Sequence, residues 1–194
     1  MMDGAPDAFG SPYRLLSGAV VPRPIAWVST RGDDADNLAP YSFSTVASVD
    51  PPVVVFAPVG RAPSLKDTPR NAISRGEFVV NVVTRDLVEA MNETAATVPS
   101  GVDEFDHAGI EKVEAVRVDA PRVADANVAF ECTLYDSMEV GSSTLVLGEV
   151  VHAHVADEVL TDGKLDTRKL DTVGRLAGNE YATTDDRFEL VRPD

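Results

Sequence analysis

Short apolar runs, interrupted by proline, glycine or charged residues, dominate the pattern along this chain. Runs of this length that are rich in β-branched residues and bounded by turn formers predict strands in preference to helices. Six such strands are expected, at residues 25–30, 42–48, 53–58, 77–83, 129–135 and 144–155. Because no regular alternation of strand and helix separates them, the pattern favours a mainly β antiparallel barrel over a doubly wound parallel sheet.

Two helices are predicted between these strands. The first is short, with Thr68 as its N-cap, Pro69 at its first helical position and Gly76 as its end. The second runs from about Arg85 to Val98. Its apolar residues have the spacing of one buried face, which is most simply core packing: Leu87, Val88, Met91, Ala95 and Val98.

The remaining segments are predicted to be turns and loops of a single domain. Asp50-Pro51-Pro52 is a turn that starts the strand at Val53, and Gly141-Ser142-Ser143 is a turn between strands. The polar stretches 99–108 and 157–169 are expected to be loops or insertions. With 194 residues, 44% of them hydrophobic, the chain is long enough for one real core, so we expect one domain over residues 1–194.

The charge of the chain limits its partners and suggests its habitat. The 32 acidic and 17 basic residues give a net charge of −15, which repels nucleic acid. No stretch has the apolar length of a membrane helix, and the N-terminus lacks the features of a signal peptide, so a cytoplasmic protein is expected. An acidic, lysine-poor surface further suggests a halophilic protein, kept soluble in a high-salt cytoplasm.

The lone cysteine, Cys132, excludes an intrachain disulfide and a thiolate zinc cluster. Alternation along its run places it with Phe130 and Leu134, so a small buried hydrophobe is expected in preference to a reactive thiol.

Two basic islands stand out in this acidic chain. Residues 8–32 contain no acid but include Arg14, Arg23 and Arg31. Residues 61–75 set four cations against the single acid Asp67: Arg61, Lys66, Arg70 and Arg75. An acidic protein that keeps such islands is expected to hold an anion there, although chance clustering on a solvated face is the alternative.

The run Ser64-Leu65-Lys66-Asp67-Thr68, followed at once by a short helix, has the chemistry of a phosphate site. A helix N-terminus offers unpaired N–H groups and a partial positive charge. The hydroxyls of Ser64 and Thr68 and the ammonium of Lys66 would complete the site. The alternative is that Thr68 only caps the helix and Lys66 is solvated.

Other recognisable chemistries are not supported. The chain has no GxGxxG after a strand, no GxxxxGK[ST] and no GxSxG, so a Rossmann site, a P-loop and a serine hydrolase are disfavoured. Its three histidines are His107, His152 and His154. The last two share one face of a predicted strand, but no third ligand stands at a suggestive spacing, so no metal site is predicted.

Several motifs in order resemble the flavin reductase-like FMN-binding proteins that include flavoredoxin. They are Pro22-Arg23-Pro24-Ile25-Ala26-Trp27-Val28-Ser29-Thr30, Asn37-Leu38-Ala39-Pro40-Tyr41-Ser42-Phe43, Asp50-Pro51-Pro52-Val53-Val54, Lys66-Asp67-Thr68 with Asn71, Gly76-Glu77-Phe78-Val79-Val80-Asn81, Asp103-Glu104-Phe105, Ala108-Gly109-Ile110, Phe130-Glu131-Cys132, Gly148-Glu149-Val150-Val151 and Arg175-Leu176-Ala177-Gly178-Asn179-Glu180-Tyr181. The resemblance covers about residues 13–193. One departure is Ala177, where such proteins often have a second glycine beside Gly178.

The resemblance implies an antiparallel Greek-key split β-barrel with a few short helices, which forms a homodimer with FMN near the interface. It places the isoalloxazine and ribityl chain along Ser29, Thr30 and the loop Asn37, Leu38, Ala39, Pro40, Tyr41 and Ser42. It places the phosphate at Ser64, Lys66, Asp67 and Thr68. No catalytic residue is certain; His154, Arg175 and Tyr181 are weaker candidates for the side of the second substrate, and a hydrogen bond to a neighbour is an equally good interpretation of His154. For Trp27, burial in the core or an interface is favoured over stacking on the flavin.

Three functions remain open at this point. The first is an oxidoreductase, an NAD(P)H:flavin reductase that uses NADH or NADPH as co-substrate and passes hydride to FMN. The second is an FMN electron carrier like flavoredoxin, without fast oxidation of nicotinamide nucleotides. The third is a non-catalytic ligand-binding barrel. A redox partner protein or a monooxygenase is a possible partner for the first two.

Overall fold

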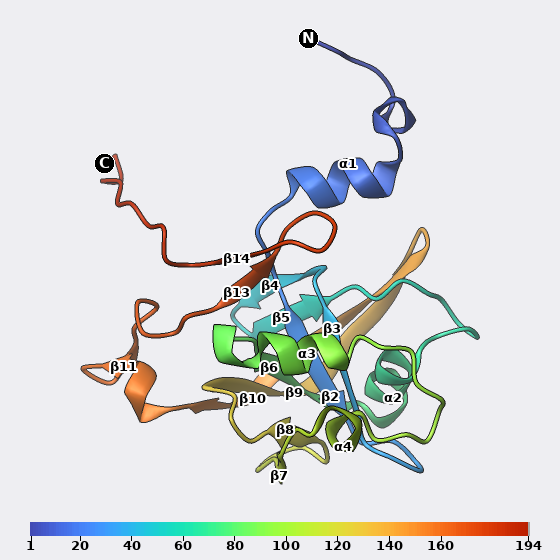
Figure 1. Cartoon of the computed structure of the whole chain (residues 1–194). Helices are drawn as coiled ribbons and strands as arrows, with labels where there is room; N and C mark the ends of the chain where they lie inside the picture. The colour runs from blue at the N-terminus through green and yellow to red at the C-terminus, as the bar shows by residue number, and fades with distance from the viewer. Residues whose placement is uncertain (194) are drawn as a thin grey trace.

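The computed structural model describes residues 1–193, and its centre is an antiparallel β-sheet of seven strands (Figure 1). The order of these strands across the sheet is β3-β2-β6-β9-β10-β5-β4. Their bounds are β2 Ala26–Thr30, β3 Asn37–Tyr41, β4 Ser44–Val49, β5 Pro52–Phe56, β6 Glu77–Val82, β9 Val128–Val140 and β10 Ser143–Val155. The edge strands β3 and β4 do not pair with each other, so the curved sheet stays open, as the split barrel expected from the sequence requires.

Smaller sheets and short helices decorate this barrel. The smaller sheets are β1 Arg23–Pro24 with β13 Val173–Arg175 and β14 Tyr181–Thr183, β7 Lys112–Glu114 with β8 Pro121–Val123, and β11 Leu160–Thr161 with β12 Lys164–Leu165. The α-helices are α1 Pro12–Ala19, α2 Asp67–Arg75, α3 Val88–Glu93 and α4 Glu104–Ala108. Three 3₁₀ turns complete the list: η1 Pro6–Phe9, η2 Arg85–Leu87 and η3 Asp157–Val159. Among the described residues, no helix is long and apolar enough to cross a membrane.

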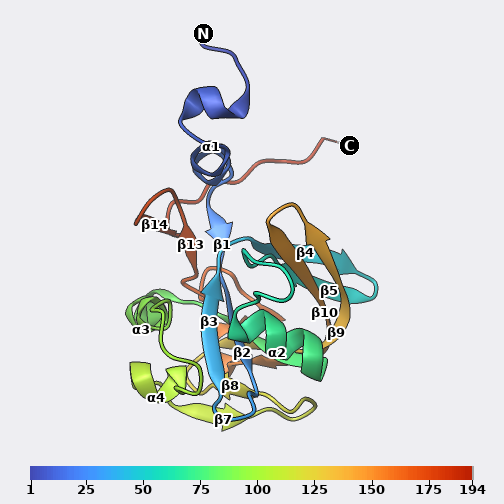
Figure 2. The same ribbon diagram turned by 90° about the vertical axis from the view of Figure 1, so that its right-hand side faces the viewer.

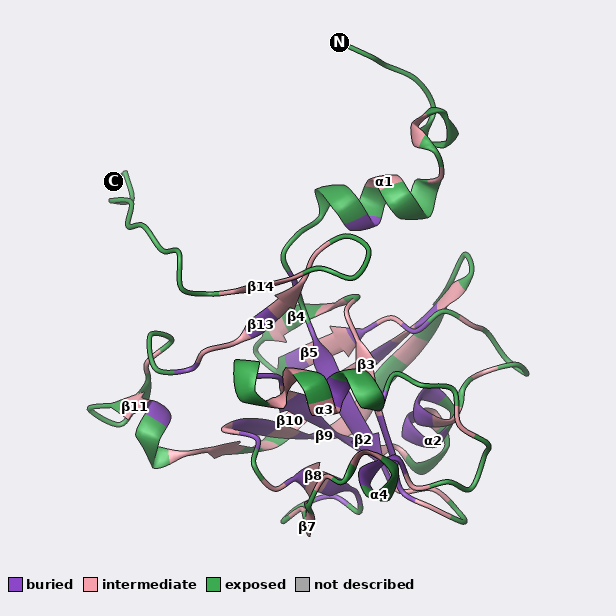
Figure 3. Ribbon diagram, in the orientation of Figure 1, coloured by how far each residue is buried: buried purple, intermediate pink, exposed green. Residues whose placement is uncertain are grey.

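Strand β2 separates two parts of the hydrophobic core. On one face, Trp27 packs with Leu38, Met91 and Phe105 under α3 and α4. On the other, Val28 belongs to the cluster inside the barrel. Both faces are therefore covered, and β2 is buried along its whole length (Figure 3), which explains why its sequence shows no polar alternation.

The two residues that the sequence singled out as core are both fully buried. Trp27 has no exposed surface, and its Nε1 donates a hydrogen bond to Thr94 Oγ1 at 2.9 Å. Cys132 lies in the barrel cluster, and burial raises the pKa of its thiol. The expectation of an inert, buried cysteine is confirmed.

All six expected strands are present, but the structure adds one that was predicted to be a loop. Residues 37–41 form β3 at the edge of the sheet, where Pro40 sits opposite Trp27 in the register. Asparagine and proline lower strand propensity, and an edge strand tolerates the missing N–H of a proline. The strand at 129–135 is also longer than expected, because β9 continues to Val140 in a long hairpin with β10.

Three helix predictions need correction. Helix α2 begins at Asp67 and has Lys66 at its N-cap position, so Thr68 is not the cap; its hydroxyl is used in a tertiary contact instead. The helix expected at 85–98 is a 3₁₀ turn at 85–87 followed by α3, which ends at Glu93, where the hydroxyl of Thr94 donates to Met91 O. The stretch 99–108, expected to be a loop, contains α4, which Asp103 caps. The end of α2 at Gly76, in the left-handed conformation, is as predicted.

The N-terminal segment stands away from the barrel (Figures 1 and 2). Helix α1 exposes Tyr13 and Leu16, and Val20, directly after the helix, is also exposed. The chain after β14 also runs outward, with Phe188 and Leu190 exposed. Exposed apolar side chains therefore gather on two segments that project from the barrel (Figure 1).

Candidate functional site

A groove of about 220 Å³ runs along β3, and we call it the β3 groove. Four segments form it: β3, the start of α2, the turn after α3 and the start of α4. Its lining residues are Asn37, Ala39, Pro40, Tyr41, Lys66, Asp67, Thr68, Thr94, Ala95, Ala96, Thr97, Val98 and Glu104. In Figure 2, β3 and α2 lie side by side in the front of the molecule, with α3 and α4 to the left.

A chain of hydrogen bonds between buried side chains fixes the floor of the β3 groove. Thr68 Oγ1 donates to Asn37 Oδ1. Asn37 Nδ2 in turn donates to Glu104 Oε1 at 2.7 Å, and the Leu38 N–H donates to Glu104 Oε2 at 3.3 Å. All three side chains are buried. The side-chain amide of Asn37 on β3 thus links α2 to α4, and the position of the start of α2 depends on this amide.

Burial controls the ionisation of two groups in this groove. It raises the pKa of Glu104, against the opposing effect of the hydrogen bonds from Asn37 and Leu38. It also raises the pKa of Tyr41, whose ring packs against Phe56 with centroids 5.0 Å apart. The Tyr41 phenol therefore remains a neutral hydrogen-bonding group at physiological pH.

The N-terminus of α2 carries the positive charge of the groove. The side chain of Lys66 is exposed at the N-cap position, and no side chain among the described residues caps the helix start. Nor does Lys66 form an ion pair within residues 1–193. The first N–H groups of a helix lack intrahelical partners. This donor set, an ammonium beside free amides, fits a phosphate monoester.

The basic islands are only partly available to an anion. Arg70 pairs with Asp67, and Arg75 pairs with Asp33 at 2.6 Å. Arg31 contacts three carboxylates, those of Asp36, Glu114 and Asp119. These three arginines are therefore already paired with carboxylates of this chain, and only the remaining cations of the islands are available to an anion.

A second pocket, of about 170 Å³, adjoins the β3 groove and shares Pro40 and Ala95 with it. We call it the arginine pocket; it is lined by Tyr13, Ser17, Arg23, Ile25, Pro40, Ser42, Met91, Ala95, Arg175, Leu176, Gly178 and Tyr181. Neither arginine forms an ion pair with a described carboxylate. The two adjoining cavities thus have cations at opposite sides, Lys66 in the β3 groove and Arg23 and Arg175 in the arginine pocket.

Backbone carbonyls hold both arginines in place. The Arg23 guanidinium donates to Leu176 O at 2.8 Å and to Val20 O at 3.1 Å, while its buried Nε has no partner among the described residues. Arg175 donates to the Tyr181 hydroxyl and lies with its guanidinium carbon 4.5 Å from the Tyr181 ring centroid. Both charges remain uncompensated, as a pocket for an anionic group requires.

The structure brings together most, but not all, of the predicted site residues. Asn37, Ala39, Pro40, Tyr41, Lys66, Asp67 and Thr68 line the β3 groove, and Ser42, Arg175 and Tyr181 line the arginine pocket. Ser29 and Thr30 are fully buried in the sheet and line neither cavity. The Ser29 hydroxyl donates to Pro121 O, and the Thr30 hydroxyl accepts from the Asn71 amide of α2. Leu38 belongs to the core, and Ser64 is exposed outside the groove.

Sequence reasoning missed the turn at 94–98 and Glu104. Ala95 and Val98 looked like the buried face of a longer helix, whereas they line the β3 groove. For Glu104 the only signal was its place in the motif Asp103-Glu104-Phe105.

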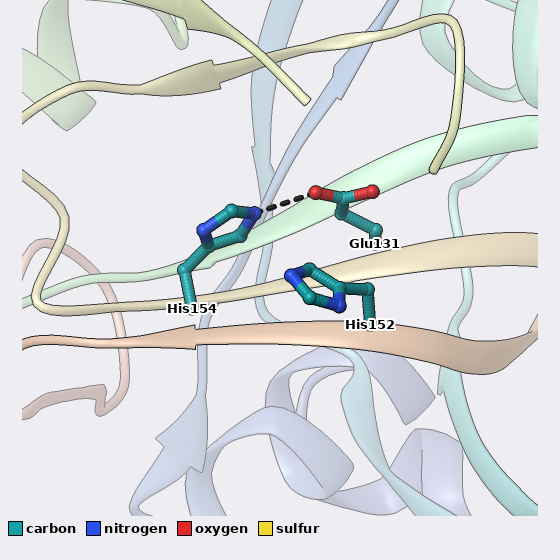
Figure 4. Close-up of side chains that lie close together, drawn as sticks. All are labelled: Glu131, His152 and His154. Carbon is teal, nitrogen blue, oxygen red and sulfur yellow. Dashed lines mark hydrogen bonds and ion pairs between the residues drawn. The ribbon is translucent and has the colours of Figure 1, made fainter. Parts of the chain in front are cut away.

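His154 lies apart from both cavities. It contacts Glu131 Oε1 through Nε2 at 2.5 Å (Figure 4), so the alternative of a strand histidine bonded to a neighbour describes its position. His152 lies beside it, with ring centroids 4.9 Å apart, as their shared face predicted. Glu131 is the third polar partner that sequence spacing did not reveal, because it belongs to the neighbouring strand.

Comparison with known proteins agrees with this architecture. The model of the flavin reductase like domain matches residues 17–172. An uncharacterized protein of Halalkalibacterium halodurans is 40% identical over 93% of this chain and 90% of its own. Among solved structures, nitrilotriacetate monooxygenase component B from Bacillus cereus is 34% identical, with a TM-score of 0.93 over 98% of both chains.

A second solved structure is similar over almost the whole chain. Pseudomonas fluorescens 2-nitrobenzoate 2-nitroreductase is 31% identical, with a TM-score of 0.90 over 99% of this chain and 96% of that one. The family match, the open barrel and the groove with a phosphate-type donor set agree with the resemblance read from the motifs, and the chain belongs to the flavin reductase-like family of flavin-related oxidoreductases.

Proposed function

We propose that this protein binds FMN in the β3 groove and acts as an NAD(P)H:flavin reductase. The observation that carries the proposal is the exposed, unpaired Lys66 at the uncapped start of α2, which opens onto a groove walled by β3. A bound flavin would supply the hydride-transfer chemistry.

The residues of this chain would bind and orient the cofactor. Lys66 and the first N–H groups of α2 would hold the phosphate. The edge strand β3 presents unpaired backbone groups that can hydrogen-bond the ring and the ribityl chain. The chain Glu104–Asn37–Thr68 would keep these two elements in register.

The arginine pocket is our proposed place for the second substrate. NADH and NADPH are anionic, and the guanidinium groups of Arg23 and Arg175 have no carboxylate partner among the described residues. Hydride transfer itself requires a nicotinamide stacked close to the flavin more than it requires an acid or base. The absence of an evident catalytic triad in the sequence is consistent with this chemistry.

An electron carrier like flavoredoxin is the second candidate, because it needs the same flavin site. The similarity to a monooxygenase component and to a nitroreductase favours an enzyme, and it suggests a monooxygenase as partner. Mixing the yellow protein anaerobically with NADH, and separately with NADPH, distinguishes the two. Bleaching at a useful rate with either nucleotide supports the reductase; no bleaching with either supports the carrier. A colourless protein that takes up no FMN would exclude both.

We also propose a homodimer with the flavin near its interface. The apolar side chains of α1 project from the barrel, and an apolar hollow of about 350 Å³ opens near the exposed Val46. A second copy would bury both surfaces, since large exposed apolar patches are uncommon on a monomer. Light scattering should give twice the chain mass of 20.7 kDa. A monomeric mass with bound FMN would contradict this arrangement.

A further inference from the structure

Three side chains with metal-binding atoms meet on the outer side of the barrel, away from the β3 groove and the arginine pocket. Glu131 comes from β9, and His152 and His154 come from β10 (Figure 4). One ligand atom of each lies within 4.8 Å of those of the other two. None of the three lines the β3 groove or the arginine pocket.

The strand register explains why these residues meet. His152 is the direct cross-strand partner of Glu131, and a bulge interrupts the pairing between Val150 and His152. Opposite residues of an antiparallel pair have their Cβ atoms about 4.5–5.5 Å apart. His154, two residues further on, points to the same face. A bulge turns side chains to new directions, and here it sets His152 beside the carboxylate.

Backbone hydrogen bonds already fix the Glu131 carboxylate, as is common for carboxylates that bind metals. Glu131 is fully buried, and its two oxygens accept hydrogen bonds from the backbone N–H groups of Val116, at 2.8 Å, and Arg117, at 2.6 Å. Such outer contacts orient ligating carboxylates and raise metal affinity. His154 contacts the oxygen that Val116 also contacts, whereas His152 makes no side-chain hydrogen bond among the described residues.

We propose that Glu131, His152 and His154 form a binding site for one divalent transition-metal ion of the zinc class. Ligand atoms about 2.0–2.2 Å from a tetrahedral zinc ion stand about 3.4 Å apart. Binding requires the imidazole rings to turn until the three atoms reach that spacing, with the ion replacing the present contact between His154 and Glu131. Both rings are partly exposed, so water can complete the coordination.

The chemical types of the three ligands determine which metal ions the site would bind. Imidazole nitrogen with one carboxylate suits zinc, cobalt, nickel and copper, whereas magnesium and calcium prefer oxygen ligands alone. A bound ion would cross-link β9, β10 and, through the Glu131 contacts, the segment at 116–117.

The test is a calorimetric titration of untagged, chelator-treated full-length protein with Zn²⁺ at neutral pH, in an excess of Mg²⁺ that occupies carboxylate-only sites. We expect one Zn²⁺ per chain. His152→Ala removes a ligand that has no hydrogen bond to lose, so the fold should persist. Loss of an outer partner already weakens metal sites about 10–100-fold, so loss of this ligand should weaken zinc binding about 100-fold or more.

His107→Ala is the matched control, because it removes the third histidine of the chain, an exposed residue of α4. It should leave zinc affinity unchanged. Co²⁺ should give the native protein, but not His152→Ala, a visible absorption band, and Zn²⁺ should raise the melting temperature of the native protein only. The proposal is overturned if the native protein binds no Zn²⁺, or if His152→Ala binds it as tightly as the native protein does.

Discussion

Replacement of Lys66 by alanine tests the phosphate end of the proposed flavin site. A phosphate monoester carries about −1.5 to −2 charges at pH 7. The attraction between two unit charges about 4 Å apart amounts to about 4 kcal/mol at an effective dielectric constant near 20, and to about 1 kcal/mol in water. Because Lys66 is exposed, the lower part of this range applies, and we expect a loss of about 1–2 kcal/mol. FMN should therefore bind roughly 5–30-fold more weakly.

Riboflavin, which lacks the phosphate, provides the internal reference. Its affinity should be the same for the native protein and for Lys66→Ala, as measured by the quenching of flavin fluorescence. Lys164→Ala is the matched control, since Lys164 is an exposed lysine on β12 that lines neither cavity. The difference between FMN and riboflavin should shrink in high salt, which screens exposed charges. Equal weakening of both ligands, or the same loss of FMN affinity in Lys164→Ala, would refute the role of Lys66.

Two further predictions concern buried groups of the β3 groove, and a third concerns the barrel core. Thr68→Val leaves the Asn37 carbonyl oxygen without its donor, so urea denaturation should show a loss of about 1–3 kcal/mol that Thr68→Ser largely restores; an unchanged stability would contradict the contact. Burial raises the pKa of Glu104 above its unfolded value of about 4.3, so the native chain loses stability as pH rises through the folded pKa. As pH rises from about 4.3 through the folded pKa, Glu104→Gln, which cannot ionise, should lose less stability than the native chain, and a larger loss in the variant would show the sign to be wrong. In Gly148→Ala, the new Cβ would lie 2.9 Å from the Cβ of Cys132 and closer still to the Phe78 ring, so thermal unfolding should reveal destabilisation by about 1–3 kcal/mol; an unaltered melting temperature would mean that the core yields there.

The sequence by itself determined the architecture, because strand formation and burial leave a local record. Short β-branched runs with turn formers between them identified six of the seven strands of the central sheet. Gly76 marked the end of α2, since only a residue that tolerates a positive φ fits there. The order of the motifs identified the family, and the Lys66 region identified one end of the groove.

Tertiary structure alone decided which polar groups meet. Threonine often caps helices, yet the hydroxyl of Thr68 donates to Asn37, because β3 lies beside α2 in the fold. Residues 37–41 form a strand because the edge of the sheet accepts Pro40, and no local pattern records that edge. Glu131 joins His152 and His154 through the register and bulge of the β9–β10 hairpin. Such long-range contacts arise from packing between distant segments, and they remain invisible in the spacing of residues along the chain.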